Sequence, residues 1–178
     1  MTLPNLATAQ LLVVDLQEKL VPAMHPDEQP RLRKCAANLI HAARHFGARV
    51  TYSEQYPQGL GPTLPELLAL LQPEERLEKL DFSVCRAAPQ LLLAQDLILI
   101  GVEAHVCVLL TALDLLAQGK RVWVPLDAVA SRDPEHKQNA LAMMQAAGAH
   151  IINTESLLFS QIGAAGSETF KKFSKLMR

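Results

Sequence analysis

DLILIGVEAHVCVLLTALDLLAQGKRVWVPL, residues Asp96–Leu126, holds a strand, a helix and a second strand in immediate succession. Asp96–Gly101 is an unbroken apolar run of strand length, as is typical of a strand buried on both faces. Val106–Gln118 carries apolar residues at helical spacing and is closed by Gly119. Arg121–Leu126 is the next apolar run. This order predicts two parallel strands joined by a right-handed helical crossover.

The same alternation continues to both sides of this unit. Further strands are predicted at Gln10–Asp15, Ala48–Glu54, Arg76–Asp81 and Ala149–Asn153. Further helices are predicted at Arg31–Phe46, Leu64–Leu71, Ala88–Gln95, Thr154–Phe159 and Ser167–Met177, with another from Pro134 to Gly148 capped by Asp133. We therefore expect one α/β domain over residues 1–178. Its architecture would be a doubly wound, six-stranded parallel sheet with helices on both faces.

The composition narrows the function classes. With 178 residues and 49% hydrophobic residues, the chain can bury one sizeable core. A net charge of −1 argues against nucleic acid or an anionic membrane as the main partner. No apolar segment approaches the roughly 20 residues of a membrane span, and no signal peptide is evident. Three cysteines form an odd and sparse set, which indicates a reducing compartment, so we expect the cytoplasm.

Three residues with chemical potential are expected at the carboxyl edge of the sheet, where ligands bind in such folds. Asp15 ends the first strand, Lys79 follows in LEKLDFS, and Cys107 lies in the first turn of the helix after Asp96–Gly101. The helix N-terminus and the lysine would lower the pKa of the Cys107 thiol and make it the most reactive of the three cysteines. Each residue taken singly also has a structural explanation. Cys107 would be a core cysteine, Asp15 a solvated acid at a strand end, and Lys79 a surface lysine.

Six sequence blocks in one order carry a family resemblance over nearly the whole chain. They are LLVVDLQEKL, SEQYPQGLGPTLPEL, KLDFS, GVEAHVCVLLTALDLLAQG, DAVASRDPEHKQNAL and TESLLF. With these blocks, the chain resembles the isochorismatase-like cysteine hydrolases, in the subgroup that excludes nicotinamidases. The resemblance implies the strand order 3-2-1-4-5-6 and a catalytic triad whose positions fall on Asp15, Lys79 and Cys107.

The resemblance also implies finer features of the site. A non-proline cis peptide would join Val102 to Glu103, and the amides of Glu103 and Cys107 would form the oxyanion hole. Many relatives have Thr where this chain has Ala104, so a hydrogen bond in that turn is missing or replaced. The metal-binding loop of nicotinamidases reads SEQYPQGLG here and has no histidine, so we expect no metal and no other cofactor.

The function expected on these grounds is metal-independent hydrolysis of a small amide or related acyl compound by Cys107, in a homo-oligomer. The position of the motifs suggests that Gln17, Leu20, Tyr56 and Phe82 line the substrate pocket. One alternative is a catalytically silent member of the fold that acts as an oligomeric interaction protein. A second alternative is a thiol sensor that uses Cys107 without turnover.

Overall fold

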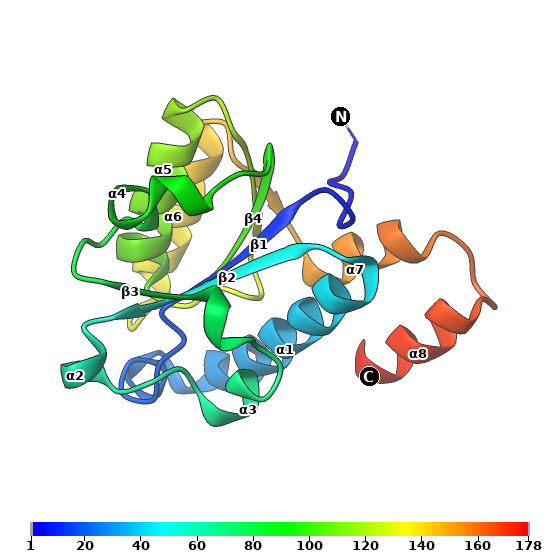
Figure 1. The fold of residues 1–178 in the computed structure, drawn as a ribbon, viewed down its shortest axis with the longest axis horizontal. Coiled ribbons are helices and arrows are strands. Elements are labelled where there is room, and N and C mark those ends of the chain that lie inside the picture. The colour runs from blue at the N-terminus through cyan, green and yellow to red at the C-terminus, as the bar shows by residue number, and fades with distance from the viewer. Residues whose placement is uncertain (1, 178) are drawn as a thin grey trace.

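A computed structural model describes residues 2–177 and contains a parallel sheet of six strands (Figure 1). The strands are β1 (Gln10–Val14), β2 (Arg49–Gln55), β3 (Arg76–Lys79), β4 (Asp96–Gly101), β5 (Arg121–Pro125) and β6 (His150–Ile152). Their order is β3-β2-β1-β4-β5-β6, and every neighbouring pair is parallel. This confirms the predicted architecture and strand order.

Helices cover both faces of the sheet (Figure 1). On one side lie α1 (Gln29–Phe46), α3 (Pro65–Leu68), α7 (Thr154–Ile162) and α8 (Glu168–Met177); on the other lie α4 (Val84–Ala87), α5 (Leu109–Ala117) and α6 (Pro134–Ala146). Strand β1 supplies both layers, because Leu11 and Val13 face the first core and Leu12 and Val14 face the second. Burial on both faces explains the continuous apolar sequence of this strand.

Short helical turns fill the connections. They are the 3₁₀ turns η1 (Val21–Ala23), η2 (Pro26–Glu28), η3 (Pro73–Glu75) and η4 (Pro89–Leu91), the π-helical turn η5 (Ala104–Val108), and α2 (Pro57–Leu60). The helix predicted over Ala88–Gln95 is wrong, since only η4 and an irregular segment occur there. Pro89 accounts for this, because a proline disfavours helical geometry at the residue before it, and Ala88 has φ −153°. The helix predicted over Leu64–Leu71 is shortened to α3.

Strands β2 and β3 extend the sheet on one side of β1, and β4 to β6 extend it on the other side. The order of the strands therefore reverses where β1 pairs with β4. Gly101, at the end of β4, has φ +127°, and a Cβ there would lie 1.9 Å from the carbonyl oxygen of Val14. This close approach lets the Val102 amide donate to the same carbonyl oxygen at 2.9 Å. The glycine thus fixes the start of the loop that leads to Cys107. Within residues 2–177, no helix has the length and apolar character needed to cross a membrane.

Candidate active site

Asp15 follows β1 in a left-handed backbone conformation, with φ 53°. Asp tolerates this conformation better than most residues do. The Asp15 amide donates to the Ser53 carbonyl of β2 at 3.1 Å, which holds the turn against the sheet. The carboxylate is fully buried: its Oδ1 accepts a hydrogen bond from Ser53 Oγ at 2.7 Å, and its Oδ2 accepts from Lys79 Nζ at 2.7 Å. Both oxygens are therefore held in fixed directions.

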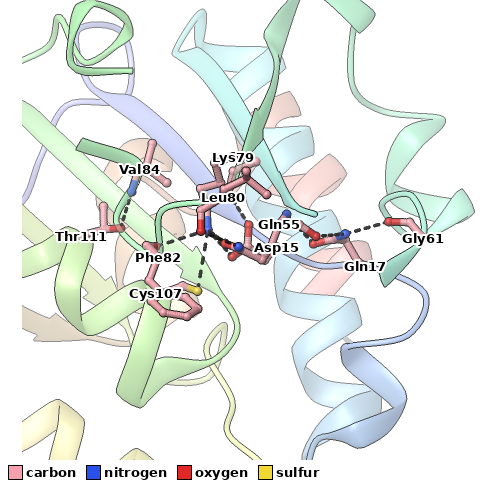
Figure 2. A network of polar contacts seen from close by, with 11 residues as sticks. Asp15, Gln17, Gln55, Gly61, Lys79, Leu80, Phe82, Val84, Cys107 and Thr111 are labelled. Carbon is pink, nitrogen blue, oxygen red and sulfur yellow. Dashed lines mark hydrogen bonds and ion pairs between the residues drawn. The ribbon is translucent and has the colours of Figure 1, made fainter. Parts of the chain in front are cut away.

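Lys79 ends the edge strand β3, and its side chain reaches past β2 toward Asp15 (Figure 2). Its ammonium group donates to Asp15 Oδ2 and to Gln55 Oε1, each at 2.7 Å, and lies 3.3 Å from the Phe82 carbonyl oxygen. The Lys79 and Asp15 side chains are both 0% exposed. A buried pair of this kind has no net charge, but it places an oriented cation and an oriented anion in a dry site.

Cys107 lies in η5, which precedes α5, and its Sγ is 3.7 Å from Lys79 Nζ. The structure thus brings Asp15, Lys79 and Cys107 together at the carboxyl edge of the sheet, although their catalytic roles stay predictions. Burial and then the charge of Asp15 raise the pKa of the Cys107 thiol from 9.0 to about 12, while the Lys79 ammonium opposes this shift.

This direction contradicts the expectation of a thiolate in the unliganded protein. Burial outweighs the effect expected of the helix N-terminus, because Cys107 is only 7% exposed. Burial is also the largest cause that raises the pKa of Cys85, to about 11, and the pKa of the half-buried Cys35. The pKa values of all three thiols are thus raised, and Cys107 would need a base in order to act as a nucleophile.

The turn before Cys107 has the geometry that the resemblance implied. The peptide bond between Val102 and Glu103 is cis. The Ala104 amide donates to the Ala130 carbonyl at 2.8 Å, so a backbone hydrogen bond holds the turn without a threonine hydroxyl. Within the described chain, the amides of Glu103 and Cys107 donate to no side chain and to no backbone carbonyl outside η5. Within residues 2–177 the same holds for the His105 amide, and the oxyanion-hole role of the Glu103 and Cys107 amides stays a prediction.

The four residues expected to line the pocket lie in different environments. Gln17 is fully buried and bonds to the backbone of residues 55 and 61, so its place in a substrate pocket stays a prediction. Leu20 is half-buried and packs against the core beside α1. Tyr56 and Phe82 are 51% and 56% exposed, and both belong to the connections that follow strands at the site's edge of the sheet.

Two open cavities border the site. One of about 230 Å³ includes Lys79 in its wall, and one of about 320 Å³ includes Phe82 and Ser83. Leu80 lines both and is 75% exposed, so each cavity has an apolar side chain beside its charged residues. Within residues 2–177, no three His, Cys, Asp or Glu side chains are grouped as metal ligands.

Two residues that contact Asp15 and Lys79 were not predicted from the sequence. Ser53 and Gln55 stand two positions apart on β2, so they share the face of the sheet that carries Asp15 and Lys79. The available signal was a run of three polar residues, Ser-Glu-Gln at 53–55, at the end of a predicted strand. It was not distinguished from an ordinary strand end exposed to solvent.

Comparison with known proteins places this geometry in context. Residues 9–156 match the Isochorismatase domain family. Isochorismatase domain-containing protein 2 of Macaca fascicularis is 39% identical over 173 residues, which cover 94% of this chain and 82% of that protein. The structure of MAR1 ribonuclease from Caenorhabditis elegans is 36% identical with a TM-score of 0.89, covering 99% of this chain and 92% of that one. The Escherichia coli YcaC gene product, an octameric hydrolase of unknown specificity, shares the fold at 20% identity with a TM-score of 0.84, covering 99% of this chain and 95% of that one.

Proposed function

Because this chain belongs to the isochorismatase family of hydrolases, we propose that it hydrolyses a small amide or related acyl compound with Cys107 as the nucleophile. The observation that carries the proposal is the buried 2.7 Å pair between Lys79 and Asp15, with Cys107 Sγ 3.7 Å from the same ammonium. A nucleophile, a base and a cation within contact distance are what acyl transfer through a thiol requires.

In the first half-reaction, Cys107 attacks the substrate carbonyl and its thiol proton passes to Asp15. The raised pKa of Cys107 keeps the thiol neutral near pH 7, so proton transfer accompanies attack rather than preceding it. The leaving amine takes the proton from Asp15, and the carbon–nitrogen bond breaks. The products of this half-reaction are a free amine and a thioester between Cys107 and the acyl group.

In the second half-reaction, water attacks the thioester and gives its proton to Asp15. The tetrahedral intermediate then expels the Cys107 sulfur, which recovers a proton from Asp15 as the free acid forms. Lys79 balances the charge of Asp15 and faces the sulfur, where negative charge develops in both halves. The amides of Glu103 and Cys107 would stabilise the oxyanion in each tetrahedral intermediate.

This chemistry requires no metal or other cofactor, since the base, the nucleophile and the oxyanion donors are all protein groups. The partner in this proposal is a small molecule that enters between the exposed side chains of Tyr56, Leu80 and Phe82. We also propose that the protein works as a homo-oligomer in the cytoplasm, in line with the apolar composition and the sparse cysteines.

A second candidate, cleavage of an RNA phosphodiester, is suggested by the name of the Caenorhabditis elegans relative, a MAR1 ribonuclease. The charge distribution here favours a small neutral substrate instead. The chain has a net charge of −1, and the cavities at the site include the acidic residues Glu78 and Asp81 beside Lys79 and Arg86. RNA binding needs clustered, unpaired cations, but Arg86 is paired with Asp114 at 3.0 Å.

The test is a screen of small amides, esters and a labelled RNA with the purified protein and a Cys107→Ala variant. We expect amide or ester turnover, an acyl adduct on Cys107 in the intact mass, and loss of both in the variant. RNA cleavage that survives Cys107→Ala would refute the thiol mechanism. Thiol oxidation without turnover of any acyl compound would favour the sensing alternative.

A further inference from the structure

Gln55 joins Lys79 to the segment that follows it. In the parallel register of β2 and β3, Gln55 lies directly opposite Lys79. Its side-chain oxygen accepts a hydrogen bond from Lys79 Nζ at 2.7 Å, and its side-chain nitrogen donates to the Leu80 carbonyl oxygen at 2.8 Å (Figure 2). One bond uses the oxygen and the other the nitrogen of the same planar amide. Rotating this amide by about 180° would therefore break both hydrogen bonds.

Gln17 in turn fixes the backbone of Gln55. The Gln17 side-chain oxygen accepts from the Gln55 amide at 2.8 Å, and its nitrogen donates to the Gln55 carbonyl oxygen at 3.0 Å. The same nitrogen donates to the Gly61 carbonyl oxygen at 2.7 Å (Figure 2). Gln17 is 0% exposed, so these bonds are shielded from water. The result is a continuous polar chain from Gly61 to the Lys79 ammonium.

An ammonium group has three donors, and their directions decide what Lys79 does. Asp15 and Gln55 take two of them at 2.7 Å each. The third lies between the Phe82 carbonyl oxygen, at 3.3 Å, and Cys107 Sγ, at 3.7 Å. Of the two groups that accept a hydrogen bond from Lys79 at 2.7 Å, Gln55 is the uncharged one. It therefore orients the ammonium toward the sulfur without adding a negative charge to the site.

We propose that Gln55, anchored by Gln17, is a positioning residue for Lys79. This inference rests on the proposed function of the site. The ionisable groups that face the Lys79 ammonium are Asp15, from the end of β1, and Cys107, from η5. The neighbouring acids Glu54 and Glu78 are each paired with Arg76, at 2.7 and 2.8 Å.

The test compares two changes at Gln55. Gln55→Leu removes both hydrogen bonds, so kcat should fall about 10- to 100-fold as the ammonium loses its direction, with KM changed less than about threefold. Gln55→Glu keeps an acceptor but adds a charge, so the acidic limb of the kcat/KM profile should move to higher pH by about one unit. Iodoacetamide should label Cys107 more slowly in both variants, because less positive charge faces the sulfur.

Gln10→Leu is the matched control. Gln10 is another buried glutamine of this sheet, at the opposite end of β1, and its side-chain nitrogen donates to Thr51 Oγ1 and the Leu91 carbonyl oxygen at 2.9 Å each. We expect a similar loss in thermal stability, with kcat, the pH profile and Cys107 labelling unchanged. This comparison separates positioning of Lys79 from general support of the fold.

The outcomes distinguish this inference from the function that it builds on. An unchanged kcat and Cys107 labelling rate in Gln55→Leu, or an unchanged pH profile in Gln55→Glu, would overturn the positioning role while leaving thiol hydrolysis intact. The same losses in Gln10→Leu would also overturn it. Full turnover in Cys107→Ala would refute the proposed function, and the labelling rates at Cys107 would still decide the role of Gln55.

Discussion

Replacement of Asp15 by Asn should change thiol labelling and turnover in opposite directions. Asp15 raises the pKa of Cys107, second only to burial, so its removal should lower that pKa and speed alkylation. The same change removes the base, so kcat should fall by about 10²- to 10⁴-fold. A group that only supported the fold would not separate these two rates.

The magnitude follows from the raised pKa of Cys107, about 12. At pH 8 about 10⁻⁴ of a thiol with this pKa is ionised, against about 10⁻¹ of a thiol with the ordinary pKa of 9.0. The more basic thiolate is about 16- to 30-fold more nucleophilic, which offsets part of this difference. The native thiol should therefore label about 30- to 60-fold more slowly than an ordinary one at equal access. Each unit by which Asp15→Asn lowers the pKa should speed labelling about threefold.

The assay is mass-spectrometric mapping of iodoacetamide labelling against time and pH, with Cys35 as the internal reference. In the native protein, Cys107 labelling should rise with pH up to at least about 10 without a plateau. Lys79→Met should have the opposite effect on the labelling rate, because Lys79 lowers the pKa of Cys107. Labelling and turnover should both become slower in this variant. Either variant breaks a buried pair at a cost of about 3–5 kcal/mol, so the melting temperature is measured first.

The reasoning would be refuted if folded Asp15→Asn labelled Cys107 more slowly than the native protein. A labelling profile that levels off below about pH 8 in the native protein would contradict the raised pKa and restore the thiolate expectation. The first result would show that the charge of Asp15 does not hold back ionisation of the thiol, and the second that the thiol is ionised before attack.

Three further predictions concern the fold and the assembly. Gly101→Ala should prevent folding or cost more than about 3 kcal/mol in urea denaturation, because its Cβ would meet the backbone of β1, whereas Gly119→Ala, with nothing within 4 Å, should cost about 1 kcal/mol. Because the pKa values of Cys85 and Cys107 are raised in the folded state, their contribution to stability is fully present below about pH 9 and should be lost as pH rises toward 11 and 12. Cys107→Ala should therefore make the fall in melting temperature over that pH range less steep. Light scattering at micromolar concentration should give a multiple of 19.5 kDa, and a monomer mass would refute the proposed homo-oligomer.

The sheet was predictable because its strands carry their burial in local sequence. Gln10–Val14 and Asp96–Gly101 are apolar throughout, since helices cover both faces, and the glycine and proline positions between them separate the elements. The strand order came from the family resemblance, because pairing between distant strands leaves no local pattern. The helix predicted from Ala88 is wrong because its apolar residues favoured a helix, whereas Pro89 restricts the backbone of the residue before it.

The site was predictable in position but not in electrostatics. Strand ends place Asp15 and Lys79 at one edge of the sheet, which sequence can indicate. The pKa of Cys107 depends on how deeply its surroundings bury it, and those surroundings come from several elements far apart in the chain. The hydrogen bonds of Gln17 and Gln55 depend on side-chain directions across strands β1 to β3, which the sequence alone does not indicate.

The seam between β1 and β4 has a consequence for how the molecule comes apart. Every strand on one side of the seam precedes every strand on the other in sequence, so the sheet consists of two contiguous halves. Asp15 and Lys79 belong to the first half, and Cys107 belongs to the second. A ligand held between them would tie the halves together, so its binding should slow opening at this seam. Two fragments divided before Asp96 would form the complete site only by joining, which makes the chain a natural starting point for a split-protein reporter.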